Sequence, residues 1–423
     1  MKALHGEIRV PGDKSIAHRA CLVAALAEGD SHIIGFSGGG DNHSTLRVLR
    51  GLGVHIEVDA ARGVRIQGRG LRGLSAPVDA LDCGNSGTTM RLMMGLLAGQ
   101  RGAFELVGDA SLSARPMERV AAPLRRLGAR IEMPAGDHPP VRVVGAPLMG
   151  SRVETLVASA QVKSACLLAG LLASGETTVF EATPTRDHTE RMLRHVGVTL
   201  HESSVGLRLL PPERLEAGEF VVPGDVSSAA FFAGAAALVP GSEVVVRGVG
   251  LNPRRVGFLH ALREMGAYVE WALAPGLAAH DEPVGDLVVR GPAALRGVDI
   301  SPERVADMVD ELPLFACLAA VADGPSVVVG AEELRVKETD RIRATGSLLR
   351  ALGATVEDTR DGWRFAGNAR LTGGAVRVEG DHRLAMCAAV LGRTVTRGPV
   401  EIDAPSIASV SFPGFFETLE RLG

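Results

Sequence analysis

The sequence predicts an α/β fold with two similar domains, each built from three repeated units of helices and strands. The first observation behind this prediction is an internal repeat, in which the octet Gly6–Asp13 returns as Gly218–Asp225 with six of eight positions identical. The two copies lie half of the 423-residue chain apart, so they mark the starts of two similar halves.

The second observation is a shorter pattern that occurs six times. A turn or capping residue precedes an apolar helix, and a short run rich in β-branched residues follows as a strand. The helices are predicted to begin near Ser15, Ser86, Ser159, Ser227, Asp310 and His382. The strands are predicted at 33–34, 104–107, 178–180, 244–246, 327–329 and 400–402.

A second helix closes each unit, and a glycine just after its last apolar residue predicts where it ends. Glycine adopts the left-handed backbone conformation that commonly terminates helices. These glycines are Gly53, Gly128, Gly197, Gly266, Gly353 and Gly423. Two more strands follow the first five glycines, whereas the sequence stops at the sixth.

The same pattern predicts the division into domains. We expect the N-terminal strand 7–10 to supply the strand that the last unit lacks, which places both chain ends in one domain. The first predicted domain is therefore 1–13 plus 225–423, and the second is 14–224. The chain is expected to cross between them near Asp13 and Asp225.

Composition limits the classes of protein to consider. Hydrophobic residues make up 46% of the chain, enough for two cores, and a net charge of −4 gives no general attraction to nucleic acid or anionic membranes. No apolar stretch suits a membrane span, and we expect no signal segment. Four of the five cysteines occupy similar places in the repeated helices, which indicates buried apolar side chains. We therefore expect a cytoplasmic protein without a metal site.

Polar residues cluster where the predicted apolar helices begin. A helix cap is the favoured explanation for any single serine there. Lys14 and Arg19 favour another interpretation, because two cations beside one helix start oppose the helix dipole unless an anion lies between them. Several such helix starts together indicate a common site that binds a strongly anionic ligand. The groups are Lys14-Ser15 with Arg19, Asn85–Thr88, Ser159 with Gln161 and Lys163, Asp310-Glu311, and Asp381–Arg383.

Two segments remain open to either interpretation. Gly84–Thr89 is a glycine turn into a helix, which suits a simple cap as well as an anion, and it lacks the spacing of a Walker loop. Arg335–Arg343 carries four cations and two anions, a pattern that is usually a solvated helix start. Its place after the apolar strand 327–329 supports a functional role equally well.

Together these motifs resemble the 5-enolpyruvylshikimate-3-phosphate synthases, in order along the whole chain. The resemblance is carried by Pro11–Ser15 with Arg19, Gly84–Thr88, Arg115–Met117, Ser159–Ala165, Arg335–Arg341 and Asp381–Arg383. The Arg-Val-Lys-Glu and Asp-His-Arg blocks are specific for this family. The resemblance implies two pseudo-symmetric domains of three βαβαββ repeats each, arranged like an inside-out α/β barrel and hinged at a double chain crossing.

The resemblance also implies a reaction. Shikimate 3-phosphate would attack C2 of phosphoenolpyruvate through its 5-hydroxyl, and the tetrahedral adduct would lose phosphate, as a step in chorismate and aromatic amino acid biosynthesis. No metal or organic cofactor is expected. The expected partners are these two small molecules, with neither nucleic acid nor membrane, and the protein is expected to be a monomer. The herbicide glyphosate occupies the phosphoenolpyruvate site in this family.

Residue roles follow from the same resemblance. Asp310 resembles the base that takes the hydroxyl proton and Glu338 the acid that protonates the methylene carbon, a pairing that acid–base chemistry requires. Lys14 and His382 complete the implied catalytic set. The implied shikimate 3-phosphate ligands are Lys14, Ser15, Arg19, Ser159, Ala160, Gln161, Arg186, Asp310 and Lys337. The implied phosphoenolpyruvate ligands are Lys14, Gly87, Arg115, Gln161, Arg341 and Arg383, with Lys337 near both substrates.

The chain departs from the family pattern at three positions. Val410 stands where many members carry a lysine, so one cation of the phosphoenolpyruvate site is missing or comes from elsewhere. Ala160 replaces the second serine of a Ser-Ser-Gln pattern, and Glu333 stands where some members have asparagine. The Gln-Val-Lys-Ser-Ala block is typical of a subgroup that includes glyphosate-tolerant enzymes, whereas Gly87 retains the space that admits the herbicide. Sensitivity to glyphosate therefore stays open.

Two other functions were weighed against this one. The related UDP-N-acetylglucosamine enolpyruvyl transferases need Lys-Asn in place of Lys14-Ser15 and usually carry a reactive cysteine in the loop occupied by Gly108–Arg115. A non-catalytic anion-binding paralogue would have lost Asp310, Glu338 or the arginines, all of which are present. Both alternatives therefore fit the sequence less well.

Overall fold

The computed structural model describes residues 2–59, 62–134, 136–395 and 397–423. The chain divides into two compact units. Unit 1 comprises Met1–Pro11, Pro223–Leu277 and Pro283–Gly423, and unit 2 comprises Gly12–Val222 and Ala278–Glu282. The predicted domain boundaries near Asp13 and Asp225 stay a prediction, and no feature of the sequence pattern indicated the separate segment Ala278–Glu282.

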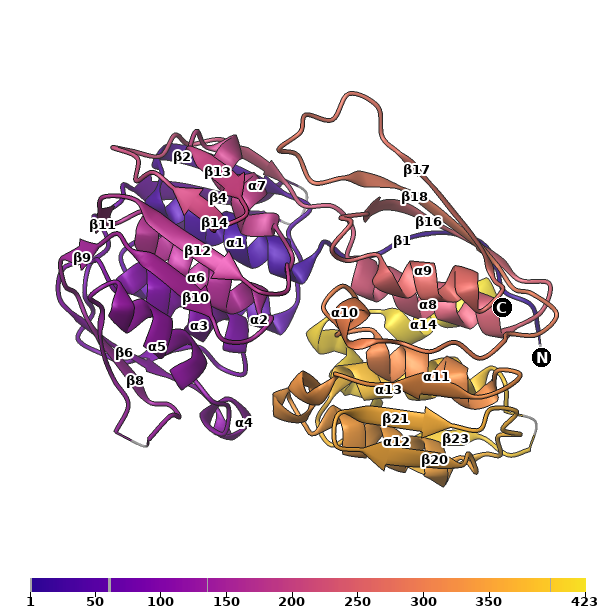
Figure 1. The fold of residues 1–423 in the computed structure, drawn as a ribbon. Coiled ribbons are helices and arrows are strands. Elements are labelled where there is room, and N and C mark those ends of the chain that lie inside the picture. The colour runs from indigo at the N-terminus through magenta and orange to yellow at the C-terminus, as the bar shows by residue number, and fades with distance from the viewer. Residues whose placement is uncertain (1, 60–61, 135, 396) are drawn as a thin grey trace. The chain divides into compact units, whose positions relative to one another are not determined.

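Three helices form the centre of each unit. They are buried on nearly every side because their sequences are apolar all round, as expected of helices enclosed by other elements. In unit 2 they are α1 (Lys14–Leu26), α3 (Gly87–Leu97) and α6 (Ala160–Gly170). In unit 1 they are α8 (Val226–Leu238), α11 (Leu312–Val321) and α13 (His382–Gly392), and each of the three contacts the other two (Figure 1).

Four sheets share one topology, in which a parallel pair of strands is followed by two antiparallel strands. This shared order reflects the repeated unit that the sequence predicted. In unit 2 the sheets are β15 (Glu219–Val221)-β2 (Glu28–Ile34)-β4 (Gly63–Arg69)-β3 (His55–Asp59), β5 (Leu81–Asp82)-β6 (Ala103–Val107)-β8 (Val141–Val144)-β7 (Arg130–Glu132), and β10 (Arg152–Thr155)-β12 (Thr177–Glu181)-β14 (Gly206–Leu209)-β13 (Leu200–Ser203). In unit 1 the sheet is β1 (His5–Arg9)-β16 (Glu243–Gly250)-β18 (Val284–Arg290)-β17 (Tyr268–Leu273).

The remaining sheets are reduced versions of the same topology. In β19 (Ser326–Val328)-β21 (Gly362–Phe365)-β20 (Val356–Thr359), a single parallel bridge between Ile300 and Val328 stands where the other sheets have a fourth strand. The sheet β22 (Gly374–Val376)-β23 (Val400–Ile402) contains the parallel pair alone. A further short pair joins β9 (Leu148–Met149) and β11 (Ala173–Ser174).

Six helices close the repeats where the glycine signals predicted. They are α2 (Gly40–Gly51), α5 (Glu118–Arg126), α7 (His188–His195), α9 (Gly257–Glu264), α12 (Arg341–Ala351) and α14 (Phe415–Leu422). The first five end beside a glycine with positive φ, for example Gly53 at 85° and Gly353 at 90°, which a side chain would strain. Shorter helical turns are α4 (Ala110–Ser113), α10 (Pro302–Val305), η1 (Glu332–Val336) and η2 (Pro405–Val410).

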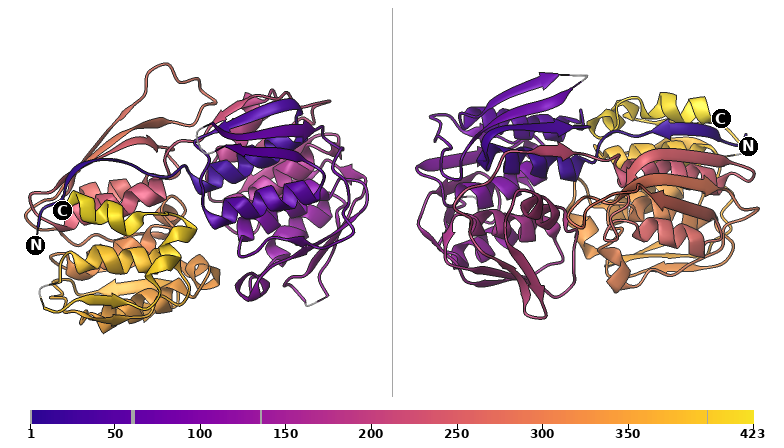
Figure 2. Two further views of the ribbon diagram at one scale, coloured as in Figure 1. Left: turned by 180° about the vertical axis from the view of Figure 1, so that it is seen from behind. Right: turned by 90° about the horizontal axis from the view of Figure 1, so that it is seen from above.

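The prediction that strand 7–10 supplies the strand missing from the last unit is wrong. This strand, β1, pairs in parallel with β16 and does not extend the sheet of the last unit. Its counterpart β15 pairs in parallel with β2. The strand of the first octet thus joins the first sheet of the second half, and the strand of the second octet joins the first sheet of the first half. In each case the chain passes to the other unit directly after the strand. Both chain ends nevertheless lie side by side in unit 1, as all three views show (Figures 1 and 2).

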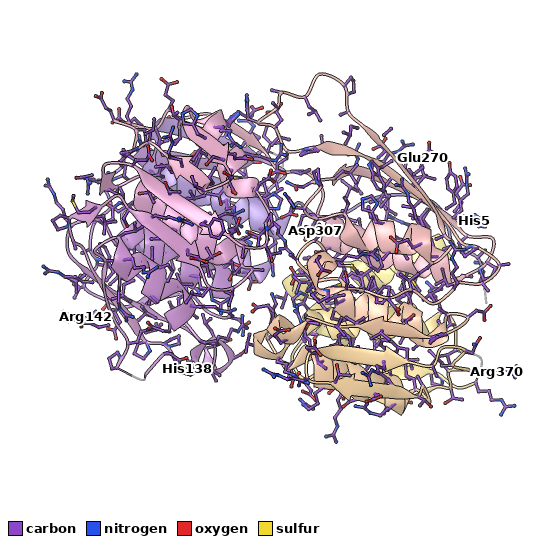
Figure 3. All side chains as sticks on the ribbon, viewed as in Figure 1. His5, His138, Arg142, Glu270, Asp307 and Arg370 are labelled. Atoms are coloured by element: carbon purple, nitrogen blue, oxygen red, sulfur yellow. The ribbon has the colours of Figure 1, made fainter. Side chains whose placement is uncertain are left out.

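Each unit has its own hydrophobic core, formed by the central helices and the inner faces of the sheets. Side chains fill the space between these layers (Figure 3). The α/β class is confirmed, and the described sheets stay separate and do not close into a barrel. Among the described residues, no helix is both long enough and apolar enough to cross a membrane.

Candidate functional site

Lys14 opens α1 in unit 2 and is held by an acidic partner. Its Nζ lies 2.9 Å from Asp41 Oδ2, and Asp41 stands in the first turn of α2. Asp13 caps α1 by accepting a hydrogen bond from the Ile16 amide. The ammonium is therefore fixed at the start of a helix, where an anion would compete with Asp41 for it.

Arg19 lies one turn further along α1 and is almost completely buried. Its guanidinium donates to Thr189 Oγ1 at 2.8 Å, Ser164 Oγ at 3.0 Å and the Ser15 carbonyl at 2.9 Å. Burial, followed by the nearby charge of Arg186, lowers the pKa of Arg19 to about 10. The two guanidinium groups repel each other, and a dianionic phosphate bound to both would relieve this repulsion.

The start of α6 adds polar groups from a neighbouring repeat. Ser159 is the capping residue, but its side chain makes no capping hydrogen bond. Ala160 follows with no polar side chain, in line with the departure noted in the sequence. Gln161 is fixed at both ends of its amide, since Oε1 accepts from Arg91 Nη1 at 2.8 Å and Nε2 donates to Thr88 Oγ1 at 2.9 Å.

Gly87 begins α3 beside two guanidinium groups. A Cβ atom at this position would lie 3.2 Å from Arg115 Nη1 and 3.3 Å from Arg91 Nη1. Arg115 is buried and donates to Asn85 Oδ1 at 2.7 Å, so its position is set by the same turn. The absence of a side chain at Gly87 therefore leaves room for two cations close to a helix N-terminus.

Arg341 is the centre of the cluster in unit 1. Its side chain is 1% exposed, and it contacts Asp381 at 2.7 Å, Glu338 at 2.7 Å and Asp310 at 3.5 Å. Burial alone would lower the pKa of Arg341, but Asp381, Glu338 and Asp310 outweigh this effect and raise it above its usual value. The guanidinium is therefore permanently charged and shared among three carboxylates.

Asp310 receives a second cation from the charged segment before α12. Lys337 Nζ lies 3.6 Å from its Oδ1 and 4.0 Å from Glu333 Oε1. Glu333 thus forms an ion pair at the position where some family members have asparagine. The carboxylate of Asp310 thus adjoins two cations, Lys337 and Arg341.

The start of α13 holds the third part of this cluster. Asp381 caps the helix by accepting from the Arg383 amide and also binds Arg341. Arg383 Nη1 donates to the Asp310 carbonyl at 2.9 Å and lies 3.6 Å from Glu311. His382 is buried at the same helix start. The capping residue Asp381 thus connects the Asp-His-Arg block to the first residue of α12.

The structure brings the predicted site residues together as two groups, one in each unit. Unit 2 holds Lys14, Ser15, Arg19, Gly87, Arg115, Ser159, Ala160, Gln161 and Arg186. Unit 1 holds Asp310, Lys337, Glu338, Arg341, His382 and Arg383. In unit 2 most members lie at the starts of the central helices, as the sequence predicted, whereas in unit 1 they lie near the starts of α11, α12 and α13.

Two polar residues that support these groups were missed in the sequence. Asp41 neutralises Lys14, and Arg91 orients Gln161. Asp381, which orients Arg341, belongs to a helix start that the sequence did indicate. Arg91 had a usable signal, because it is a cation within the otherwise apolar helix Gly87–Leu97. Asp41 had none, because its partner lies in another helix.

The described residues contain one group that could hold a metal, and none of its members is a predicted site residue. His195, His280 and Asp281 offer ligand atoms within 4.8 Å of one another. His195 Nε2 already contacts the Glu219 carbonyl at 3.0 Å. The expected absence of a metal site stays a prediction. Val410 ends η2, where the family pattern has a lysine.

Comparison with known proteins identifies the family. A family model described as EPSP synthase (3-phosphoshikimate 1-carboxyvinyltransferase) matches residues 1–419. A 3-phosphoshikimate 1-carboxyvinyltransferase of Thermus thermophilus is 50% identical over 99% of this chain and 96% of its own, and one of Xanthomonas euvesicatoria is 51% identical over 98% and 93%.

A solved structure of EPSP synthase from Acinetobacter baumannii is also similar in fold. It has a TM-score of 0.87 and 41% sequence identity, covering 100% of this chain and 96% of that one. The fold, the motifs and the whole-chain matches agree. The chain therefore belongs to the EPSP synthase family of carboxyvinyl transferases.

Proposed function

We propose that the protein transfers the enolpyruvyl group of phosphoenolpyruvate to the 5-hydroxyl of shikimate 3-phosphate and releases phosphate. The observation that carries this proposal is the contact of buried Arg341 with both Asp310 and Glu338. One permanent cation thus adjoins the two carboxylates that acid–base chemistry at C2 and C3 of phosphoenolpyruvate requires.

Asp310 serves as the base in this proposal. Its carboxylate lies beside Lys337 and Arg341 and would accept the proton of the 5-hydroxyl as that oxygen attacks C2. Glu338 supplies a proton to the methylene carbon C3 in the same addition. The product of these steps is a tetrahedral adduct that carries both the former 5-hydroxyl oxygen and the phosphate on C2.

Arg341 also determines when Glu338 can act as an acid. When no substrate is bound, Arg341 donates a hydrogen bond of 2.7 Å to the Glu338 carboxylate. The carboxylate of phosphoenolpyruvate would accept hydrogen bonds from Arg341 and Arg383 in place of Glu338. Glu338 would then hold a proton more readily, and it could return to the carboxylate form by protonating C3.

Elimination reverses the proton transfer at C3. Glu338 removes a proton from the new methyl group as the bond between C2 and the phosphate oxygen breaks, which restores the vinyl group. Lys14 and Arg115 stabilise the departing phosphate in this proposal, and Gln161 and Gly87 line the same ligand. Arg19, Arg186, Ser15 and Ser159 bind the phosphate and hydroxyl groups of shikimate 3-phosphate.

Phosphate release from phosphoenolpyruvate, measured with two acceptors in parallel, tests this function. We expect release with shikimate 3-phosphate and none with UDP-N-acetylglucosamine. Release with only the second acceptor would assign the chain to the related transferase reaction, and release with neither would indicate a non-catalytic paralogue. A glyphosate titration in the first assay would measure herbicide sensitivity.

We further propose that the protein works as a monomer in the cytoplasm. All five cysteines are buried as free thiols, which suits a reducing compartment. Light scattering coupled to size-exclusion chromatography would measure the mass directly. A mass of twice the 44.1 kDa chain would contradict the monomer.

A further inference from the structure

The segment that carries Arg186 is fastened to α6 by one buried lysine. This segment runs from Glu181, at the end of β12, to Glu190, in the first turn of α7. Lys163 lies on α6, and its side chain is 3% exposed. The sequence grouped Lys163 with Ser159 and Gln161 at a helix start that suits an anion, but its ammonium is paired with carboxylates of the protein and the proposed reaction gives it no role.

Every donor of the Lys163 ammonium is used on this segment. Nζ lies 2.8 Å from Glu181 Oε2, 2.7 Å from Glu190 Oε1 and 3.1 Å from the Thr185 carbonyl oxygen. An ammonium group has three N–H donors, and here they reach the beginning, the middle and the end of one segment. Breaking any of these contacts would leave a buried charge or carbonyl with fewer partners.

The middle contact lies directly beside Arg186. The Thr185 carbonyl accepts a hydrogen bond from Lys163, and the Thr185 hydroxyl donates one to Glu181 Oε1. Both the main chain and the side chain of Thr185 are therefore fixed. Arg186 is the next residue, and its charge lowers the pKa of the buried Arg19. The path of the backbone at Thr185 therefore determines where the Arg186 guanidinium can reach.

The same helix also fixes Arg19. Ser164 follows Lys163 and accepts from Arg19 Nη2 at 3.0 Å, and its hydroxyl lies 2.7 Å from Thr189 Oγ1. Thr189 in turn accepts from Arg19 Nε at 2.8 Å. Ser164 thus holds the Arg19 guanidinium directly. The adjacent Lys163 holds the Arg186 guanidinium indirectly, through the segment 181–190.

Electrostatics requires such an anchor, because Arg19 and Arg186 repel each other. Lys163 is paired with two carboxylates, so the buried trio carries a net negative charge when all three groups are ionised. Glu190 is among the charges that favour the cationic form of Arg19. The trio therefore offsets part of the repulsion between the two arginines until a phosphate binds.

We propose that Lys163 is a positioning residue for shikimate 3-phosphate, which holds the segment 181–190 so that Arg186 and Arg19 bind the same phosphate group. This inference rests on the proposed function, in which both arginines bind that substrate. Lys163 itself does not touch the substrate. Its removal should therefore weaken one substrate selectively and act mainly through Arg186, the residue that follows the Thr185 contact.

Steady-state kinetics of Lys163→Met provides the first test. We expect the KM for shikimate 3-phosphate to rise on the order of tenfold, the scale of coupling between contacting groups. The KM for phosphoenolpyruvate and kcat at saturation should stay close to those of the unaltered protein. Equal changes for both substrates would indicate a general structural role and overturn the proposal, as would an unchanged KM in a folded variant.

A double-mutant cycle with Arg186→Ala separates positioning from independent binding. If Lys163 acts through Arg186, adding Lys163→Met to Arg186→Ala should produce no further loss of affinity for shikimate 3-phosphate, measured by calorimetry. Losses that multiply would overturn the proposal. An Arg186→Ala variant with unaltered affinity would instead refute the role of Arg186, and an unaltered protein that fails to bind shikimate 3-phosphate would refute the proposed function.

Two further variants keep the test decisive. Glu181→Gln retains the volume but removes one charge from the trio, so it should raise the same KM by a smaller factor even if Lys163→Met fails to fold. Arg142→Gln removes an exposed ion pair with Glu132 in the same unit and should change neither KM. Figure 3 shows Arg142 at the outer edge of this unit.

Discussion

Arg341 and Arg19 illustrate how single residues prepare the two groups for anions. Arg341 is buried among three carboxylates, whereas Arg19 is buried among neutral oxygens with Arg186 nearby. An anion near Arg341 would replace an existing negative partner, but an anion near Arg19 would add one. The arrangement at Arg341 suits a reaction in which a protein carboxylate must leave the guanidinium when substrate binds. The arrangement at Arg19 suits tight binding of phosphate.

Replacing the two proposed proton-transfer groups should abolish turnover while substrates still bind. Asp310→Asn cannot accept the hydroxyl proton, and Glu338→Gln cannot protonate carbon. We expect kcat to fall by at least about a hundredfold in each variant, the usual contribution of a general acid or base. Calorimetry should show retained binding of shikimate 3-phosphate to Glu338→Gln. Turnover that persists in both variants would mean that the proton-transfer roles are wrong.

Gly87→Ala should affect phosphoenolpyruvate more than shikimate 3-phosphate. The new Cβ would lie 3.2 Å from Arg115 Nη1 and 3.3 Å from Arg91 Nη1, so both guanidinium groups would have to shift. We expect a several-fold rise in the KM for phosphoenolpyruvate. Gly38→Ala is a suitable control, because a Cβ there meets no atom within 4 Å. The same KM in both variants would contradict this account of Gly87.

At the scale of elements, helix starts were predictable because their signals are local. Ser86 caps α3 as expected by accepting from the Thr89 amide, and Asp381 caps α13 in the same way. The helix expected at Asp310 begins at Leu312, with Glu311 as its capping residue and a proline in its first turn. Strand pairing was harder to predict, since β1 and β15 follow the same sequence pattern and only non-local contacts decide which sheet each joins.

A buried chain of hydrogen bonds connects three elements of unit 2. His18 on α1 contacts Thr45 on α2 at 2.7 Å, Thr45 contacts Thr89 on α3 at 2.7 Å, and Thr89 donates to Ser86 at 2.8 Å. Because Thr89 donates to Ser86, Thr45 must donate to Thr89, and His18 Nδ1 must therefore donate to Thr45. This direction requires a proton on Nδ1, and burial keeps the ring neutral by disfavouring a second proton on Nε2.

Acid should weaken the fold through His18. Burial, opposed in part by Asp41, lowers the pKa of His18 from 6.5 to about 3, with Lys14, Arg19 and Asp13 as further nearby charges. The unfolded chain therefore binds a proton at a higher pH than the folded protein. The stability that depends on neutral His18 is fully present above pH 6.5 and is lost as pH falls toward 3.

Urea unfolding at several pH values measures this effect. Between about pH 6 and 4, the free energy of unfolding of His18→Asn should fall less steeply than that of the unaltered protein, by about 1.4 kcal/mol per pH unit. The exposed His201→Asn should leave the slope unchanged. Identical slopes for the unaltered protein and His18→Asn would contradict the prediction.

At the scale of the whole molecule, the repeats explain both what the sequence predicted and what it did not. The same helix start recurs in different repeats, so Lys14, Ser159 and Asp381 could be recognised as parts of one kind of site. Their supporting contacts join different elements, some within one repeat and some between repeats, and leave no periodic signal. Lys163 illustrates this, because its carboxylate partners on β12 and α7 became apparent only in the folded chain.

The central claim is that the protein protonates C3 of phosphoenolpyruvate before phosphate leaves. Running the reaction in D2O and analysing the product by mass spectrometry tests it most directly. The account predicts deuterium in the vinyl group of the product, with labelling lost in Glu338→Gln. Phosphate release that is accompanied by an unlabelled vinyl group would show that phosphate leaves without protonation at carbon, and it would contradict the mechanism.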